Sequence, residues 1–397
     1  MLINMLLGVY SGLPLALTLG TLQAWMTDEK VDLRVIGLMT LVGLPYTLKF
    51  LWAPLFDRVT LPFLGRRRGW LFVIQLVLVG AIFFMSQSAP SLFPGVFAAA
   101  AFLVAFFSAS QDIVIDAWRR EALQDKELGL GSSLYVNGYR IGMLISGAGA
   151  LFMADHMNWR WVYTGMAAVM ATGLLATLMA PEPEVEAPPP RSLKEAVIEP
   201  FVDYFERKGA WLILAFILLY KVGDTMASAL TTTFYLELGF TKSEVAAVVK
   251  GFGFAATLLG GFLGGVWMLR LGIYRALWIF GILQAASTAG FALLAQAGHS
   301  VPGLSGVIFF ENLTGGMGTS AYVAFMASLT NKRFTATQYA LLSSLMGIPR
   351  VIVSAPTGYL VHELGWFSFF LVCTVIALPG MLLLRSFKKD LTATELN

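Results

Sequence analysis

FAAAAFLVAFFSASQDIVIDAW, residues 97–118, joins a long apolar run to two acids. All eleven residues from Phe97 to Phe107 are apolar, which predicts a buried or membrane-spanning helix. Asp112 and Asp116 follow four residues apart, so a helix would place both carboxylates on one face. Each acid costs on the order of 3 kcal/mol in the hydrocarbon core. The stretch therefore predicts a water-filled path or a buried cationic partner beside these acids.

The composition of the whole chain is typical of a polytopic helical membrane protein. Of the 397 residues, 57% are hydrophobic and 13% are charged, and the mean hydropathy is +0.73. A soluble domain averages about 25% charged residues, so we expect neither a soluble protein nor a nucleic-acid-binding protein. One cysteine, Cys373, excludes an internal disulfide, and three scattered histidines do not suit a zinc site. We expect no metal and no cofactor.

Runs of about 20 apolar residues predict an all-α fold with twelve membrane helices. Their expected ranges are 2–25, 33–56, 69–87, 92–117, 129–153, 159–180, 210–235, 244–269, 273–296, 301–328, 336–361 and 365–385. Eighteen lysines and arginines fall in the loops and tail on one side of these helices, and four fall on the other side. Basic residues favour the cytoplasmic side, which predicts that both termini are cytoplasmic.

The chain is expected to consist of two related six-helix halves. Its longest connection, at residues 181–209, separates an N-terminal half (1–180) from a C-terminal half with a short tail (210–397). Arg119-Arg120 follows the fourth predicted helix just as Lys332-Arg333 follows the tenth. Such internal repeats around a central cytoplasmic loop are typical of secondary transporters.

The central connection itself is expected to have two parts. Pro181–Pro190 is rich in proline and glutamate, which is typical of a solvated, extended linker. Ser192 and Glu195 then have the spacing of a capping box, and an amphipathic pattern follows them. We expect a short helix on the cytoplasmic membrane surface, kinked or split at Pro200.

Nine ionisable residues fall inside the predicted membrane helices, where an unpaired charge is costly. They are Asp112, Asp116, Asp224, Glu311, Lys49, Arg140, Lys221, Lys250 and Arg350. Lys221 and Asp224 lie three residues apart and are expected to pair, and Asp112 or Asp116 is within reach of Arg140 on the next helix. Any single residue here is as well explained as a structural clamp between helices, but nine of them favour a functional role.

Three of the acids are expected to carry protons. Burial and neighbouring like charge both raise the pKa of a carboxyl group, which allows it to bind and release a proton near neutral pH. Asp112 and Asp116 are the best candidates, and Glu311 is a further one. Gln23, Gln111 and Asn312 are interpreted as hydrogen-bonding residues for a polar ligand such as a sugar. Most aromatic residues nearby are expected to serve only packing or contact with lipid.

A basic loop follows the second predicted helix. Asp57-Arg58 and then Gly65-Arg66-Arg67-Arg68-Gly69 resemble the loop signature of the major facilitator superfamily, although Ala53 replaces a glycine of that signature and the spacer is long. In that superfamily the acid helps to latch the two halves, so the resemblance implies that Asp57 and Arg58 are gating residues. The alternative is that the arginines only anchor the loop on the cytoplasmic side.

Motifs along nearly the whole chain resemble the AmpG muropeptide permeases of Gram-negative bacteria, a family of the major facilitator superfamily. They are Ser11–Thr18, Leu22–Met26, Phe50–Pro54, Gly65–Trp70, Ser108–Asp112, Phe310–Leu313 and Gly318–Ser320. The resemblance implies a carrier in the bacterial inner membrane that imports N-acetylglucosaminyl-1,6-anhydro-N-acetylmuramic acid, with or without its peptide, from periplasm to cytoplasm. The proton gradient would drive import, which would serve cell-wall recycling and β-lactamase induction.

The same resemblance places predicted helices 1, 4, 7 and 10 around the substrate cavity. An anionic amino-sugar peptide needs hydrogen-bond donors and positive charge, for which arginine and lysine are suited. The expected substrate-binding residues are Gln23, Gln111, Arg140, Lys221, Asp224 and Asn312. Two alternatives remain at this point, namely a carrier of another large anion such as acetyl-coenzyme A and a membrane sensor that transports nothing. No motif indicates an intramembrane enzyme.

Overall fold

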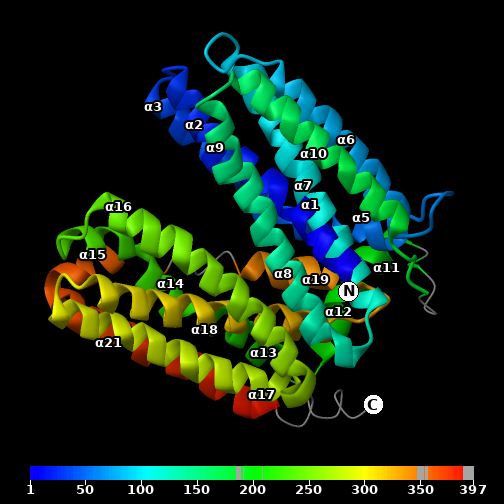
Figure 1. Ribbon diagram of the computed structural model, residues 1–397. Helices are drawn as coiled ribbons and strands as arrows, with labels where there is room; N and C mark the ends of the chain where they lie inside the picture. Colours follow the sequence, from blue (N-terminus) through cyan, green and yellow to red (C-terminus); the bar gives the residue numbers. More distant parts are fainter. Residues whose placement is uncertain (185–188, 191, 208, 347–352, 354–355, 388–397) are drawn as a thin grey trace. The chain divides into compact units, whose positions relative to one another are not determined.

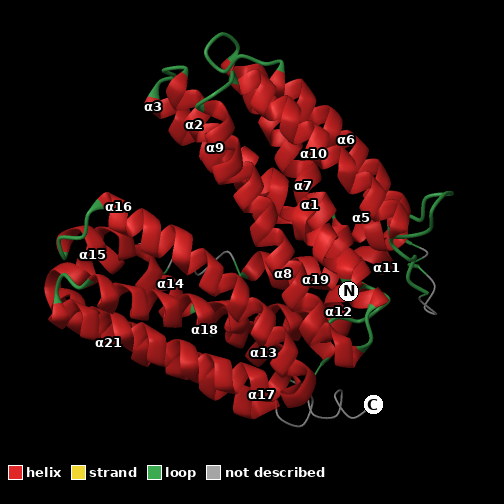
Figure 2. Cartoon of the chain, viewed as in Figure 1, coloured by secondary structure: helices red, strands yellow, loops and turns green. Residues whose placement is uncertain are grey.

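The computed structural model (Figure 1) describes residues 1–184, 189–190, 192–207, 209–346, 353 and 356–387. Within these ranges every regular element is a helix and no strand occurs (Figure 2). The chain forms two compact units. The first comprises Met1–Gln124, Leu134–Phe201 and Thr330–Ser344, and the second comprises Asp125–Ser133, Val202–Leu329 and Leu345–Asn397.

Eight helical stretches in the described residues are long and apolar enough to cross a membrane. They are Leu2–Asp28, Arg34–Leu51, Arg68–Ser86, Pro94–Ala122, Trp159–Met179, Ala210–Glu237, Val245–Ala297 and Thr357–Ser386. The longest of them covers two predicted helices and contains a non-helical residue, Gly272, with φ 73° and ψ 166°. The same kind of break occurs at Gly365, at the start of the last predicted helix. A break of this kind allows one helical stretch to change direction.

The helices of the N-terminal half have the following bounds (Figure 1). They are α1 (Leu2–Thr18), α2 (Gly20–Asp28), α3 (Leu33–Leu38), α4 (Leu44–Leu48), α5 (Ala53–Arg58), α6 (Arg68–Ser86), α7 (Pro94–Ala122), α8 (Leu128–Leu144), α9 (Ala150–Ala154) and α10 (Trp159–Met179). Short 3-10 turns join α3 to α4 and α4 to α5, so the second predicted helix is interrupted. In Figure 1, α6 and α10 run side by side, and α7 packs against both α6 and α1.

Helices α1 and α8 approach so closely that only glycine fits between them. A Cβ atom at Gly12 would lie 2.0 Å from the Tyr139 carbonyl oxygen, and one at Gly142 would lie 2.1 Å from the Val9 carbonyl oxygen. This close approach places the polar residues of α1 beside those of α8. It thereby sets the geometry of the first polar cluster described below.

The remaining helices belong to the central connection and the C-terminal half. They are α11 (Leu193–Val197), α12 (Glu199–Glu206), α13 (Ala210–Leu219), α14 (Val222–Ala229), α15 (Thr231–Glu237), α16 (Lys242–Glu244), a π-helical segment (Val245–Phe252), α17 (Gly253–Ala297), α18 (Val301–Ser328), α19 (Thr335–Leu345) and α21 (Thr357–Leu383). Helix α19 comes from the C-terminal half of the sequence. Its residues up to Ser344 nevertheless belong to the first unit.

Two sequence predictions about local structure are confirmed. Ser192 Oγ accepts a hydrogen bond from the Glu195 N–H at 3.1 Å, and the helix is split between α11 and α12, just before Pro200.

The glycines of α18 permit close packing against α17, because a Cβ atom at Gly316 would lie 2.3 Å from the Thr257 carbonyl oxygen.

Candidate functional site

The two acids of α7 lie buried in the first unit and have different partners. Asp112 is 6% exposed and accepts a hydrogen bond from Ser11 Oγ of α1. The Ser11 hydroxyl is in turn 2.9 Å from the Tyr135 hydroxyl of α8. Asp112 therefore meets a chain of neutral hydroxyl groups. Sequence reasoning did not assign Ser11 or Tyr135 a role, because only the close packing of α1 and α8 brings them to the acid.

Asp116, which is 4% exposed, contacts two cations instead. Its carboxylate lies 3.0 Å from Arg119 Nη2 and 3.8 Å from Lys49 Nζ. Arg119 also donates to the Tyr339 hydroxyl of α19 at 2.9 Å, and its guanidinium lies 4.2 Å from the Tyr135 ring centroid. Asp116 is thus joined through Arg119 to α19, a helix from the other half of the sequence.

This difference separates the two acids chemically. A carboxyl group bonded to a hydroxyl can become neutral without leaving a cation unpaired. Protonation of Asp116 would instead break the ion pair with Arg119 and leave Lys49 only its interaction with Asp112, and an unpaired buried charge is costly. Asp112 is therefore the acid that can change its protonation state with less disturbance.

The second unit contains its own polar cluster on α14, α17 and α18. Lys221 Nζ lies 3.4 Å from Asp224 Oδ2 and 3.0 Å from Gln284 Oε1, so the predicted pair of Lys221 and Asp224 is confirmed. Glu311 accepts a hydrogen bond from Ser287 Oγ, and its carboxyl group interacts with that of Asp224. Two acids and one lysine thus form a single polar cluster in this unit.

The ion pair of Lys221 and Asp224 can be tested by a double-mutant cycle. Lys221→Ala should lower thermal stability more than the double change Lys221→Ala with Asp224→Ala, because the single change leaves an acid without its cation. The side chains are 17% and 28% exposed, so we expect a coupling of about 1 kcal/mol. Differential scanning fluorimetry of the purified protein measures it. Strictly additive losses would contradict the pairing.

Of the other predicted ligand-binding residues, Gln23, Gln111 and Arg140 belong to the first unit and Asn312 belongs to the second. Gln111 is fully buried and donates from Nε2 to the Tyr10 carbonyl oxygen at 2.8 Å. The Asn312 amide accepts from Thr257 Oγ1 at 2.7 Å and donates to a carbonyl oxygen of its own helix. Gln23 and Arg140 are half-buried. Arg350, another predicted intramembrane charge, lies outside the described residues.

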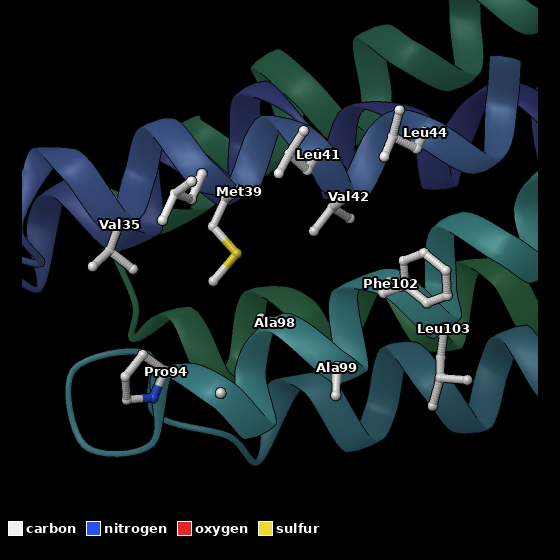
Figure 3. A pocket seen from close by; sticks show the side chains of 12 residues that line it. Val35, Met39, Leu41, Val42, Leu44, Pro94, Ala98, Ala99, Phe102 and Leu103 are labelled. Carbon is white, nitrogen blue, oxygen red and sulfur yellow. The ribbon is translucent and has the colours of Figure 1, made fainter.

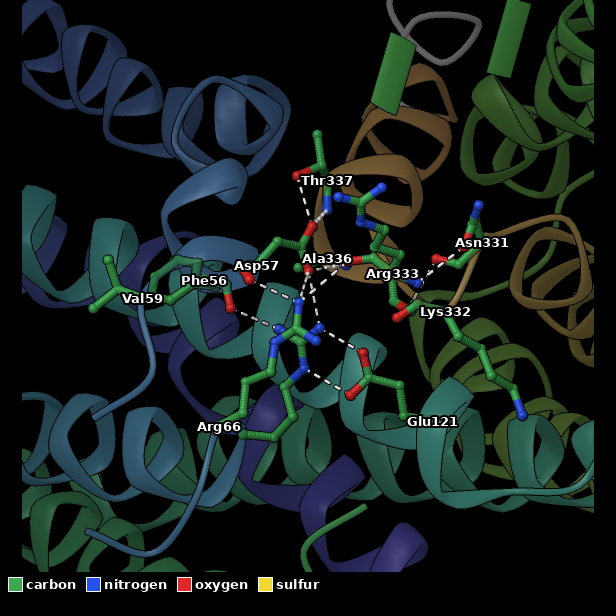
Figure 4. Close-up of polar contacts among 12 residues, drawn as sticks. Phe56, Asp57, Val59, Arg66, Glu121, Asn331, Lys332, Arg333, Ala336 and Thr337 are labelled. Atoms are coloured by element: carbon green, nitrogen blue, oxygen red, sulfur yellow. Dashed lines mark hydrogen bonds and ion pairs between the residues drawn. The ribbon is translucent and has the colours of Figure 1, made fainter. Parts of the chain in front are cut away.

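Asp57 forms the centre of a buried polar network at the start of α19 (Figure 4). Its side chain is 0% exposed and caps α19 from outside the helix. The carboxylate accepts from the Ala336 N–H at 3.1 Å and from the Thr337 N–H and hydroxyl at 2.8 and 2.7 Å. These N–H groups carry the positive end of the helix dipole, so an acid is favoured there.

The same carboxylate also meets two of the loop arginines. Arg67 is fully buried, lies 2.9 Å from Asp57 Oδ1 and forms a second ion pair with Glu121 at 2.5 Å. Burial alone would lower the pKa of Arg67, but the carboxylates of Glu121 and Asp57 raise it above its ordinary value. Arg66 lies 3.5 Å from Asp57 Oδ1 and donates to the Arg333 carbonyl oxygen at 3.2 Å. A role as surface anchor alone does not account for a fully buried arginine.

Arg58, predicted as a gating residue with Asp57, takes no part in this network. It ends α5 half-buried and makes no hydrogen bond or ion pair with the described residues. Its gating role stays a prediction.

The central connection is anchored on the same network at its beginning. Glu182 accepts from the Arg67 N–H at 2.8 Å and from the Arg68 N–H at 3.0 Å, and so caps α6. Trp118 Nε1 donates to the Pro181 carbonyl oxygen at 2.8 Å. Pro181 and Glu184 are exposed, as expected of a solvated linker, while the orphan N–H groups of α6 provide a partner for the Glu182 carboxylate.

Further along, the connection holds the start of α19. Arg333 forms ion pairs with Glu195 of α11 and, at 3.6 Å, with Glu199 of α12. Gln338 Nε2 donates to the Pro200 carbonyl oxygen at 3.0 Å. Asp57, α11 and α12 thus hold one end of α19 from several directions.

Gly65 makes the capping of α6 by Glu182 possible. Its φ of +86° is a left-handed conformation, and a Cβ atom there would lie 2.6 Å from the Glu182 side chain. Gly65→Ala should therefore lower the free energy of unfolding by about 1–3 kcal/mol, through backbone strain and loss of the cap. Thermal unfolding in detergent measures it. Gly80→Ala on α6, where nothing lies within 4 Å, is the matched control and should be nearly neutral; equal melting temperatures for both variants would contradict this account.

An apolar groove of about 760 Å³ lies between the α3–α4 region and α7 in the first unit. Figure 3 shows its side chains, from Val35 to Leu44 on one side and from Pro94 to Leu103 on the other. Every lining residue is apolar, so the groove offers a sugar no hydrogen-bonding side chain. In the described part of the chain, no cluster of three or more His, Cys, Asp or Glu residues suits a metal ion either.

Comparison with known sequences identifies relatives over the full length of the chain. The Major Facilitator Superfamily model matches residues 5–354. The chain is 49% identical over 397 residues to the anhydromuropeptide permease of Escherichia coli K12, covering all of this chain and 81% of the relative. It is 36% identical over 389 residues to the putative transporter AmpG 4 of Rickettsia conorii, covering 96% of this chain and 94% of the relative.

Solved structures share the fold at low sequence identity. The fucose:proton symporter FucP of Escherichia coli has a TM-score of 0.75 at 11% identity, covering 96% of this chain and 97% of that one. The proton:xylose symporter XylE bound to 6-bromo-6-deoxy-D-glucose has a TM-score of 0.71 at 11% identity, covering 97% and 94%. At this identity the likeness concerns the fold alone.

Proposed function

The chain belongs to the Major Facilitator Superfamily and, within it, to the anhydromuropeptide permease family, and we propose that it imports anhydro-muropeptides by proton-coupled alternating access. The cargo is N-acetylglucosaminyl-1,6-anhydro-N-acetylmuramic acid, with or without its peptide. The single observation that supports this choice of cargo is the 49% identity to a named anhydromuropeptide permease over the whole chain. The protein is not an enzyme but a multi-pass membrane permease.

We further propose twelve membrane helices in the inner membrane, with residues 1–180 and 210–397 as the two halves and 181–209 as their connection. The breaks at Gly272 and Gly365 support this count, because each divides one helical stretch at a boundary that the sequence predicts. The excess of basic residues on one side supports cytoplasmic termini. The network around Asp57 then lies on the cytoplasmic side.

Asp112 is the proposed proton carrier of the N-terminal half. Its partner is a hydroxyl group, so it can take up a proton without leaving a cation unpaired. Asp116 is assigned a coupling role, because it contacts Arg119, which also binds Tyr339 of α19. Glu311, paired with Asp224, is the proposed proton-coupling acid of the C-terminal half.

Asp57 is the proposed cytoplasmic gate residue, with Arg58 as its neighbour. Movement of α19 away from α5 would break three hydrogen bonds to the Asp57 carboxylate and release the ion pairs of Arg333. The proposed substrate contacts are Gln23, Gln111, Arg140, Lys221, Asp224 and Asn312. The anionic cargo favours Arg140 and Lys221 for its carboxylates.

Counterflow in proteoliposomes tests the proposed function. Vesicles loaded with unlabelled anhydro-muropeptide should exchange it rapidly for external labelled anhydro-muropeptide, and excess acetyl-coenzyme A should not compete. Competition by acetyl-coenzyme A would favour a carrier of another large anion. Absence of exchange by a folded protein would favour a sensor and would contradict the proposal. Import of this cargo would supply cell-wall recycling and the signal for β-lactamase induction.

A further inference from the structure

A small cavity lies beside the acid pair of the second unit. Its volume is about 10 Å³, which is the space that one water molecule needs. It is lined by Tyr220, Asp224, Gly281, Gln284, Ala285, Thr288, Ala377 and Met381. Four of these residues contribute only apolar surface and four contribute polar side-chain groups. A water molecule in the cavity therefore has polar groups beside it.

Gln284 lines this cavity and has a side-chain hydrogen-bond donor without a partner among the described residues. The side chain is 6% exposed, and its Oε1 accepts from the Lys221 ammonium group at 3.0 Å. An ammonium group only donates, so this contact fixes which end of the amide faces Lys221. The Nε2 group has no partner among the described residues. A buried donor of this kind requires an acceptor.

Acceptors are present around the same cavity. The Tyr220 hydroxyl donates to the Leu277 carbonyl oxygen at 2.9 Å, and Thr288 Oγ1 donates to the Gln284 carbonyl oxygen at 3.1 Å. Both hydroxyl oxygens keep lone pairs, and the Asp224 carboxylate that accepts from Lys221 keeps further acceptor capacity. One water molecule can accept from Gln284 Nε2 and donate to two of these groups, which matches the two to four partners of a typical buried water.

We propose that this cavity binds one water molecule and that this water delivers the proton to the Asp224–Glu311 pair. An O–H bond of the water breaks as an O–H bond forms on the Asp224 carboxylate. The water then regains a proton from hydronium of the solvent and is unchanged. Gln284, which sequence analysis did not single out, is the positioning residue that holds the water. This inference rests on the proposed proton-coupled transport, because it assigns the route by which Glu311 and Asp224 are protonated.

The water itself can be detected by X-ray hydroxyl-radical footprinting of the full-length protein. Radicals formed from an ordered water oxidise the side chains beside it. Met381 lines the cavity and is 3% exposed, and Met226 is also 3% exposed but does not line it. Met381 should be oxidised several-fold faster than Met226, and Thr288→Val should slow its oxidation. Equal rates for the two methionines would overturn the water site.

The relay role is tested by filling the cavity. Ala285→Val places two methyl groups where the water binds, and Ala286→Val on the exposed side of the same helix is the matched control. Ala285→Val should keep counterflow exchange and lose most pH-driven accumulation, whereas Ala286→Val should keep both. Wild-type accumulation by Ala285→Val with slowed Met381 oxidation would overturn the relay. Loss of counterflow in the wild type would instead refute the proposed function itself.

Discussion

Asp112→Asn is expected to abolish concentrative uptake while substrate exchange continues. With a gradient of one pH unit, each coupled proton contributes about 1.4 kcal/mol, enough for about tenfold accumulation. Asparagine keeps the shape of the side chain and can still bond Ser11 Oγ, but it cannot carry a proton. The ratio of internal to external substrate should therefore fall to about one. Uptake of labelled anhydro-muropeptide into proteoliposomes measures this ratio.

Asp116→Asn distinguishes the proposed proton carrier, Asp112, from the proposed coupling residue, Asp116. It removes the carboxylate that forms ion pairs with Lys49 and Arg119, and breaking a buried pair costs about 3–5 kcal/mol. Both accumulation and exchange should then be lost, with a lower melting temperature. Accumulation at the wild-type ratio by both variants would contradict a proton role for α7.

Asp57→Asn is expected to release the start of α19. The change removes the charge that stabilises two backbone N–H groups and leaves Arg67 with Glu121 as its one remaining acid among the described residues. Loss of a buried ion pair costs about 3 kcal/mol or more, which lowers the population of the latched state about 100-fold. Uptake should fall in proportion, because the carrier can no longer close this gate.

Thiol labelling provides the direct measurement. Cys373, the single native cysteine, is buried, and Thr335→Cys places a reporter at a fully buried position of α19. A maleimide should label this reporter much faster in the Asp57→Asn background than in the parent. Glu184→Gln, which removes one negative charge from an exposed position of the connection, is the matched control and should change nothing. Equal labelling of all three proteins would refute the latch.

Local patterns in the sequence predicted several features of the structure. Apolar runs predicted an all-helical chain, the spacing of Lys221 and Asp224 predicted their ion pair, and Ser192 predicted the cap of α11. The last two predictions succeeded because each depends on residues within one helical turn of each other. The resemblance to a permease family was likewise carried by short motifs, and full-length identity to a permease supports it.

Features that depend on distant parts of the chain were not predicted. Thr337 and Glu182 have no local pattern that indicates a role, and they meet Asp57 and Arg67 only through tertiary packing. In the sequence, Gln284 is one polar residue in an apolar run. Only the structure shows that its Oε1 accepts from Lys221 and that its Nε2 has no partner among the described residues. The predicted proximity of Arg140 to the acids of α7 stays a prediction.

Simultaneous measurement of substrate and proton uptake in wild-type proteoliposomes tests the central claim most directly. An acidic exterior should drive labelled anhydro-muropeptide to an internal concentration about tenfold above the external one per pH unit and per coupled proton. Protons should enter with the substrate, and an uncoupler should abolish the accumulation. Substrate that only equilibrates, with no proton entry and no response to the uncoupler, would contradict proton-coupled import.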